Sequence, residues 1–377
     1  MRSRALALLL TLACSVPAAA QQEVPRRLDF STDTVLPARP PEATRALRNR
    51  FVRNQTILGL SVYGPSFAVM VGTDGVTGTA AYLVMAGGSF FASAEYARRA
   101  EVTEAKVLLS TAMAWRTAGS ALFIGSETEA KGRSVAAMTL VGGLGGTVAG
   151  VLLGNGLTGG EAAATVFGHD LAYASAVAVS FAVAPDLSDP GVLDARYAAG
   201  WTAAGAVGYV LGNAYARRVP YNLTVGDVST LWLGAGVGAL GASTFIANND
   251  PSNEAIALTL LGGALVGTVA SDRFLVRRYD HSRSDAAFVS LGALAGGVMG
   301  VGVGVLAAGE ADRDGSLTRS FATLGAIGGI FMAERYLQTD RDAGRASRLG
   351  RLELHPMGAV AAATGAPGRH TLLRYTF

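Results

Sequence analysis

The stretch GGLGGTVAGVLLG at residues 142–154 places glycine at every fourth position, at Gly142, Gly146, Gly150 and Gly154. Residues four apart lie almost above one another on an α-helix, so these glycines predict one smooth stripe along a helix face. A glycine inside a helix costs about 1 kcal/mol relative to alanine, and close approach of a second helix is the natural compensation. The stretch therefore predicts a helix packed closely against another helix.

Small residues recur with the same spacing in other apolar segments of the chain. Beyond the first stretch, the glycines predicted to pack in this way are Gly200, Gly208, Gly212, Gly263, Gly267, Gly292, Gly296, Gly300 and Gly304. This pattern resembles that of glycine-zipper proteins over residues 54–338. The resemblance implies membrane association and self-assembly, and it concerns a packing mode without naming a substrate or a specific family.

The composition is that of an apolar protein. Of the 377 residues, 50% are hydrophobic and 16% are charged, and the mean hydropathy is +0.35. Ordinary soluble domains carry about a quarter charged residues. These values exclude a disordered chain, a disulfide scaffold and a highly charged nucleic-acid binder.

Residues 54–338 form a core of about ten apolar segments, each of roughly 19 to 27 residues, separated by short polar turns. The motif Tyr96-Ala97-Arg98-Arg99 recurs 119 residues later at Tyr215-Ala216-Arg217-Arg218, and a looser copy, Arg277-Arg278-Tyr279, follows after about 60 more. These steps indicate a repeat of about 60 residues, or two segments. We predict an all-α fold, an array of about ten helices rich in glycine and alanine and arranged as hairpin repeats.

Helix N-caps are predicted after several of the turns. There a hydroxyl residue is followed three positions later by an acid, which suits the positive end of a helix dipole. We expect the capped helices to be the second members of two-segment units. The pairs are Thr158 with Glu161, Thr224 with Asp227, and Ser282 with Asp285.

A transmembrane β-barrel is the alternative fold, because a period of four is also a multiple of two. Gly234, Gly236 and Gly238 alternate as residues of a strand would. Each apolar segment is long enough for two barrel strands of about 9 to 11 residues. Aromatic residues make up only 7% of the chain, which is few for two interfacial girdles.

The C-terminal tail, residues 339–377, predicts a short β-hairpin. Leu373, Tyr375 and Phe377 alternate with more polar residues, and residues 351–355 supply a second strand. The terminal phenylalanine resembles the final strand signal of outer-membrane barrel proteins. A soluble hairpin packed on the helices is the other interpretation.

The N-terminal region predicts export. Residues 1–20 have the form of a signal peptide, with Arg2 and Arg4 before an apolar run and three alanines before Gln21. Cleavage would remove the only cysteine and lower the net charge from +3 to +1. Residues 21–53, rich in proline and arginine, predict an extended lead-in.

Arginine placement bears on the membrane in which the chain resides. A cleaved signal would leave the mature N-terminus outside, and most arginines at segment ends would then lie outside too. That reverses the positive-inside rule. We therefore expect the outer membrane or the periplasm, with the inner membrane as the alternative.

The candidate chemical groups are few. Glu310, Asp312 and Asp314 have the spacing of a calcium loop, but Phe321 occupies the position of its bidentate acid, so the metal prediction is weak. His169-Asp170 lies in an apolar segment and predicts an interhelical hydrogen bond or a proton relay. The chain shows no catalytic, nucleotide or cofactor motif, and we expect no cofactor.

Together these features predict an exported, non-enzymatic envelope protein, a structural or self-assembling helical-repeat scaffold. The expected partners are membrane lipid, copies of the same chain, or both, with no nucleic acid and no identifiable small-molecule substrate. The alternatives are an outer-membrane barrel pore and a multipass inner-membrane transporter.

Overall fold

The computed structural model describes residues 41–72, 75–128, 130–184, 195–246, 251–308, 315–345, 351–354 and 373–376, and these are overwhelmingly helical. The helices are α2 (Pro41–Leu58), α3 (Gly64–Val71), α4 (Gly75–Arg99), α5 (Glu104–Glu127), α6 (Gly132–Leu153), α7 (Gly159–Val183), α8 (Ala195–Arg218), α9 (Val225–Ala242), α10 (Asn253–Ser271), α11 (Arg283–Ala308) and α12 (Ser316–Arg345). Three short turns extend them: η1 (Gly59–Tyr63) joins α2 to α3, η3 (Ser243–Phe245) follows α9, and η4 (Asp272–Val276) follows α10.

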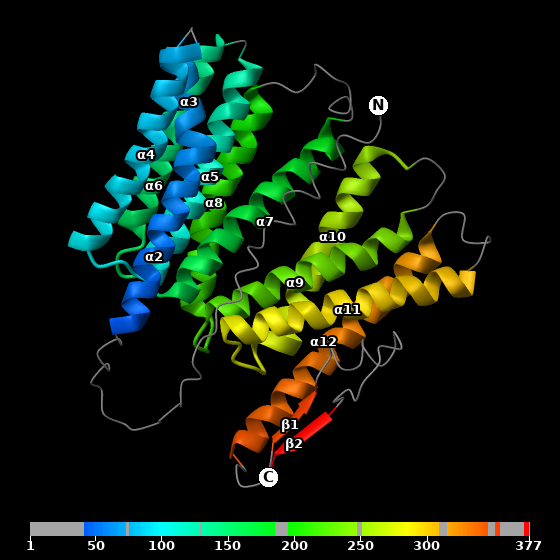
Figure 1. Ribbon diagram of the computed structural model, residues 1–377. Coiled ribbons are helices and arrows are strands. Elements are labelled where there is room, and N and C mark those ends of the chain that lie inside the picture. Colours follow the sequence, from blue (N-terminus) through cyan, green and yellow to red (C-terminus); the bar gives the residue numbers. More distant parts are fainter. Residues whose placement is uncertain are drawn as a thin grey trace, which may run out of the picture.

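Helices that follow one another in the chain pack as hairpins. The largest interhelical contacts of the described residues lie within the pairs α5–α6, α7–α8, α9–α10 and α11–α12. The first helices of these pairs also contact one another in chain order, α5 with α7, α7 with α9, and α9 with α11. Figure 1 shows the resulting array, with α2, α3 and α4 packed beside α5 and α6. The predicted all-helical array of about ten helices is confirmed.

The three predicted N-caps are present. The Thr158 amide donates to Glu161 Oε2 at 2.7 Å, and the Glu161 amide donates to Thr158 Oγ1 at 3.2 Å. Thr224 with Asp227 and Ser282 with Asp285 form the same reciprocal contacts. One expectation was wrong: the capped helices α7, α9 and α11 are the first members of their hairpins, because each pairs with the helix that follows it.

The N-termini of α5, α7, α9 and α11 meet at one end of the array. Arg283 on α11 donates to Glu104 on α5 at 2.6 Å, and the hydroxyl of Thr224, before α9, donates to the carbonyl oxygen of His281 at 2.6 Å. The C-terminal ends of α4, α8 and η4 lie beside these N-termini: Ala97 of α4 packs with Val107 of α5, Arg217 of α8 pairs with Glu161 of α7, and Val276 of η4 packs with Val228 of α9. We call this region the capped end; from it, α5, α7 and α9 point in diverging directions (Figure 1).

Two expectations about β-structure are corrected. The barrel alternative is not supported, because the described core is helical and the alternating glycines Gly234, Gly236 and Gly238 all lie in α9. Strands β1 (Arg351–Leu354) and β2 (Leu373–Thr376) pair antiparallel. These four-residue strands do not establish the predicted C-terminal hairpin, since residues 355–372 and Phe377 lie outside the described residues.

The two N-terminal predictions fare differently. Residues 1–20, the predicted signal peptide, lie outside the described residues, as do residues 21–40. The described part of the predicted extended lead-in, residues 41–53, is instead helical within α2. Pro41 opens that helix, a position where its fixed φ and missing amide hydrogen are tolerated.

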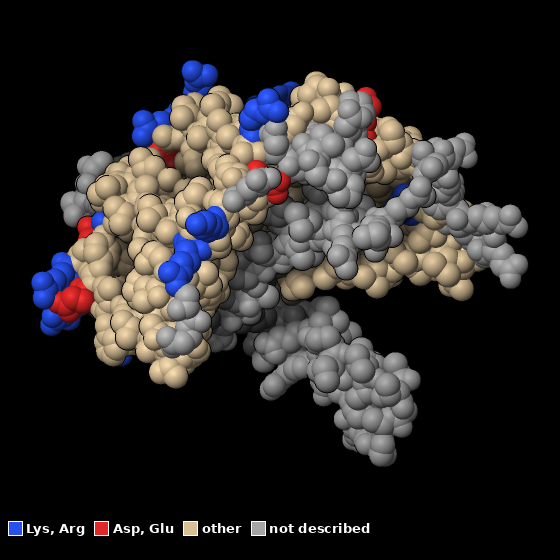
Figure 2. Space-filling model, turned by 90° about the horizontal axis from the view of Figure 1, so that it is seen from above, with Lys and Arg blue, Asp and Glu red and all other residues tan. Residues whose placement is uncertain are grey.

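Many apolar side chains of the described helices face outward. Seven helical segments are long and apolar enough to cross a membrane: α4, α5, α6, α7, α9 with η3, α10 with η4, and α11. On α11, Leu291, Leu294 and Val298 are 62%, 64% and 64% exposed. On the face that Figure 2 shows, uncharged residues make up most of the described surface, and the basic and acidic residues stand in small separate groups. These helices support a membrane location, whereas the expected outer-membrane or periplasmic location is not supported.

Candidate functional site

The glycines of residues 142–154 lie where α6 crosses α5. A Cβ atom added to Gly142 would stand 2.7 Å from the Thr117 carbonyl oxygen, and one added to Gly146 would stand 2.6 Å from that of Met113. An added Cβ atom at Gly150 would stand closer still to the backbone of α5, and one at Gly154 would stand 2.9 Å from its nearest atom. Real Cβ atoms do not come this close to a backbone, so α6 can pack here only because these side chains are absent.

Most of the other predicted packing glycines have the same surroundings. Gly208 and Gly212 approach the backbone of α7, and Gly263 and Gly267 approach that of α9. The four predicted glycines of α11, at 292, 296, 300 and 304, approach the backbone of α12. Gly200 differs, because no atom lies within 4 Å of its added Cβ. The glycines on the facing helices are Gly168, Gly234, Gly238, Gly325 and Gly329. Of these, only Gly168 belongs to a stripe of small residues that was predicted from the four-residue spacing.

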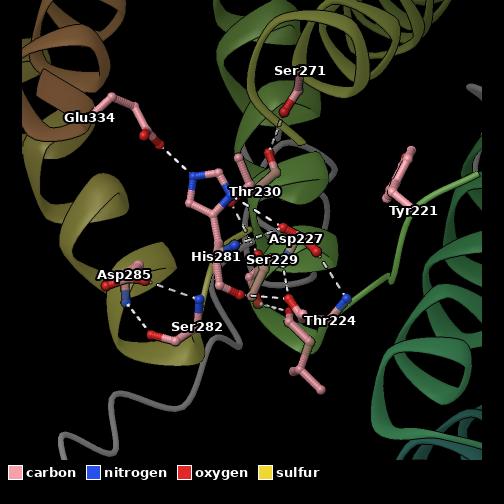
Figure 3. A network of polar contacts seen from close by, with 12 residues as sticks. Tyr221, Thr224, Asp227, Ser229, Thr230, Ser271, His281, Ser282, Asp285 and Glu334 are labelled. Atoms are coloured by element: carbon pink, nitrogen blue, oxygen red, sulfur yellow. Dashed lines mark hydrogen bonds and ion pairs between the residues drawn. The ribbon is translucent and has the colours of Figure 1, made fainter. Parts of the chain in front are cut away.

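The most deeply buried polar cluster surrounds His281, which lies between η4 and α11. Its ring Nδ1 is 3.2 Å from Asp227 Oδ1 in the first turn of α9, and its Nε2 is 2.5 Å from Glu334 Oε1 on α12. His281, Asp227 and Glu334 are 0%, 1% and 2% exposed. Figure 3 shows the imidazole held between the two carboxylates, so this cluster joins three elements of two adjacent hairpins.

Backbone groups fix the same cluster. The His281 amide donates to Asp227 Oδ1 at 3.0 Å, and the Thr224 amide donates to Asp227 Oδ2 at 2.9 Å. Asp227 is therefore both the capping acid of α9 and the partner of the imidazole. Glu334 Oε2 is buried and has no hydrogen-bond partner among the described residues.

The arrangement favours a charged imidazole. Both ring nitrogens face a carboxylate oxygen, and only the imidazolium form can donate from both. Burial acts to lower the pKa of His281, but the hydrogen bonds and negative charges of Asp227 and Glu334 outweigh it and raise the pKa to about 9. The cluster is suited to holding a positive charge and to joining the segment before α11 to α9 and α12.

A second polar cluster joins α5 to α7. Arg116 on α5 binds Asp170 on α7 through both Nε and Nη2, with Nε 2.5 Å from Asp170 Oδ1. His169 Nδ1 is 2.9 Å from the same oxygen, and its ring lies 4.5 Å from the ring of Tyr209. His169-Asp170 thus takes part in an interhelical contact, one of the two outcomes predicted for it.

The weak calcium candidate cannot be placed, because Glu310, Asp312 and Asp314 lie outside the described residues. Phe321, which occupies the place of the missing acid, lies on α12. Within the described part of the chain, no group of three histidine, cysteine or acidic side chains could hold a metal ion.

Several residues of these clusters were missed from the sequence. Glu334 lies 53 residues from His281, Arg116 lies 54 from Asp170, and Arg283 lies 179 from Glu104. Residues so far apart in the sequence cannot belong to one local motif. The sequence offers one signal for such clusters, which is an ionisable residue within an apolar segment. From that signal only His169-Asp170 was predicted to form a polar contact.

Comparisons of the chain with family models, with curated proteins and with solved structures give no match. The resemblance to glycine-zipper proteins therefore remains one of pattern, with no specific family attached.

Proposed function

We propose that this chain is a non-enzymatic integral membrane protein, a scaffold of helical hairpins embedded in an inner, cytoplasmic-type membrane. The observation that carries the proposal is the outward apolar surface of helices that are long enough to cross a bilayer. Helices satisfy their own backbone hydrogen bonds, so such segments are stable in lipid. In water, the same exposed surface would drive aggregation.

The interior packing supports a lipid environment. In a bilayer, lipid tails are as apolar as the helix surfaces, so association relies on close packing and on interhelical polar contacts. Gly146 against Met113 and Gly296 against the Gly325 carbonyl supply the close packing, and Arg116 with Asp170 supplies a polar contact.

Self-association is part of the proposal. Because the glycines at the crossings are already covered by helices of the same chain, it rests on small residues that the chain leaves uncovered, such as Gly200. Cross-linking of the full chain in native membranes tests it. A ladder of oligomers is expected, and a monomer at every cross-linker concentration would contradict it.

Fractionation tests the membrane proposal directly. The full chain should sediment with membranes and stay there after washing with alkaline carbonate, which removes peripheral proteins. Release into the carbonate supernatant, or recovery in the soluble fraction, would refute the proposal.

A transporter is the second candidate, because of the ion pair between α5 and α7. The side chains of Arg116 and Asp170 are 24% and 22% exposed on helices suited to a bilayer, where ionisable groups usually serve transport or proton transfer. The hydroxyl of Tyr209 is buried without a hydrogen-bond partner among the described residues.

Proton flux tests the transporter. Proteoliposomes with an entrapped pH-sensitive dye should show a proton flux, and the Asp170→Asn variant should lose it. The control variant is Glu95→Gln, which removes an acid from an exposed ion pair and should keep the flux. If proteoliposomes and empty liposomes show the same proton flux, the transporter is excluded and the scaffold is the one proposal that stands.

A further inference from the structure

Exposed arginines gather at the capped end. They come from the C-terminal ends of α4 and α8 and from η4 with the turn after it. The side chains of Arg98, Arg99 and Arg217 are 72%, 75% and 61% exposed. This group, which we call the arginine rim, comprises Arg98, Arg99, Arg217, Arg218, Arg273, Arg277 and Arg278.

The acids beside the rim do not neutralise it. Three acids pair with four of its seven arginines: Glu95 with both Arg98 and Arg99, Glu161 with Arg217, and Asp272 with Arg277. Arg218 and Arg273 form no ion pair with any other residue that the structure describes. The rim therefore presents an excess of positive charge, which is complementary to an anionic surface.

Aromatic residues lie beside the rim, where the charges meet the apolar helix surfaces. The guanidinium of Arg278 lies 5.8 Å from the centre of the Phe274 ring, and Phe274 is 53% exposed. Tyr215 and Tyr221 each donate to Asp272 Oδ1 at 2.7 Å. Aromatic side chains with one polar edge favour the boundary between lipid headgroups and acyl chains.

Among the residues that the structure describes, the opposite ends of the helices carry fewer cationic side chains. Lys131 and Arg133 precede or open α6, Arg196 lies in the first turn of α8, and Arg319 lies in the first turn of α12. Lysine and arginine accumulate on the cytoplasmic side of membrane proteins, and acids contribute little to this bias. The difference between the two ends thus distinguishes the two faces of the membrane.

From this asymmetry we infer that the arginine rim binds the phosphate groups of anionic phospholipids and holds the capped end at the cytoplasmic face of the membrane. The inference rests on the proposed function, because it requires the helices to be embedded. It also places α2 beside the cytoplasmic face, since Arg50 and Phe51 of α2 contact Glu104 and Tyr96 at the capped end. A cleaved signal peptide would leave α2 on the other side.

Cysteine labelling tests the orientation. In a Cys14→Ala background the full chain has no cysteine, so Arg218→Cys reports on the rim and Arg133→Cys on the opposite end. With a membrane-impermeant maleimide, position 218 should react in inverted vesicles and be protected in intact cells, and position 133 should do the reverse. Labelling of position 218 in intact cells would overturn the inference, even when carbonate washing shows that the protein is embedded.

Lipid dependence tests the ligand. The melting temperature of the full chain in phosphatidylcholine nanodiscs should rise when phosphatidylglycerol is included in the lipid. The gain should disappear in Arg218→Glu/Arg273→Glu/Arg278→Glu and persist in the matched lysine triple variant, which keeps the charge. The natural chain, the glutamate variant and the lysine variant are compared. The same rise in melting temperature in all three, or no rise in any of them, would overturn lipid binding by the rim.

Discussion

The helix crossings and the capped end are held together in different ways. At the crossings, glycines bring one backbone against another, as Gly296 does with the carbonyl oxygen of Gly325. At the capped end, ionised and polar side chains join helices far apart in the chain, as His281 does with Asp227 and Glu334. The crossings should therefore be sensitive to side-chain size, and the capped end to charge and pH.

Loss of the buried imidazole should have the largest effect. His281→Ala would leave Asp227 and Glu334 buried and close together without their cation, and breaking a buried ion pair in this way costs about 3–5 kcal/mol. The free energy of unfolding in mixed detergent micelles measures this. The exposed Ser284→Ala, in the first turn of α11, should change stability by no more than about 0.5 kcal/mol. Equal stability of the two variants would contradict the role of the cluster.

The same cluster should make stability depend on pH. Because folding raises the pKa of His281 from 6.5 to about 9, its contribution is fully present below pH 6.5 and is lost as the pH rises through 9. The raised pKa corresponds to about 3 kcal/mol. Melting temperatures between pH 6 and pH 10 should fall for the natural chain and stay nearly flat for His281→Gln. Parallel pH profiles would show that another group titrates.

A side chain at a crossing should destabilise by overpacking. Gly146→Leu would push carbon atoms into the backbone of α5, whereas Gly145→Leu points into open space on the same helix. We expect a loss of about 1–3 kcal/mol, or more, for the first and a small gain or no change for the second. Thermal unfolding of the pair measures the difference. Equal losses would mean that glycine serves helix flexibility here and not close packing.

Removal of one N-cap should have the smallest effect. Thr158→Ala deletes the side-chain acceptor for the Glu161 amide and should cost about 1 kcal/mol. Thr158→Ser keeps the hydroxyl and should retain most of the stability. A serine variant as unstable as the alanine variant would indicate that the threonine methyl group matters more than the cap.

The two regions also differ in how far the sequence predicts them. The crossings follow from a local period, since Gly142 to Gly154 define a helix face by themselves. The caps are equally local, because Thr158 and Glu161 are three residues apart. A four-residue period identifies one face of a helix, but it does not show whether another helix packs against that face. Gly200 fits the pattern yet stands in open space.

The polar clusters could not be predicted, because their members come together only when the hairpins stack. Asp227 was identified as a capping acid, but its contact with His281 depends on α9 and α11 being neighbours. Arg116 gave no signal of its own within the apolar segment of α5. Which ionisable groups meet is therefore a property of the tertiary arrangement.

The central claim is that the exposed apolar faces contact lipid, and fluorescence quenching tests it most directly. In a Cys14→Ala background, a fluorophore on Val298→Cys would stand on α11 at a position 64% exposed. In reconstituted vesicles we predict quenching by phospholipids with brominated acyl chains and none by iodide in the water. Quenching by iodide with no response to brominated lipid would show that this face meets water, and would contradict the account.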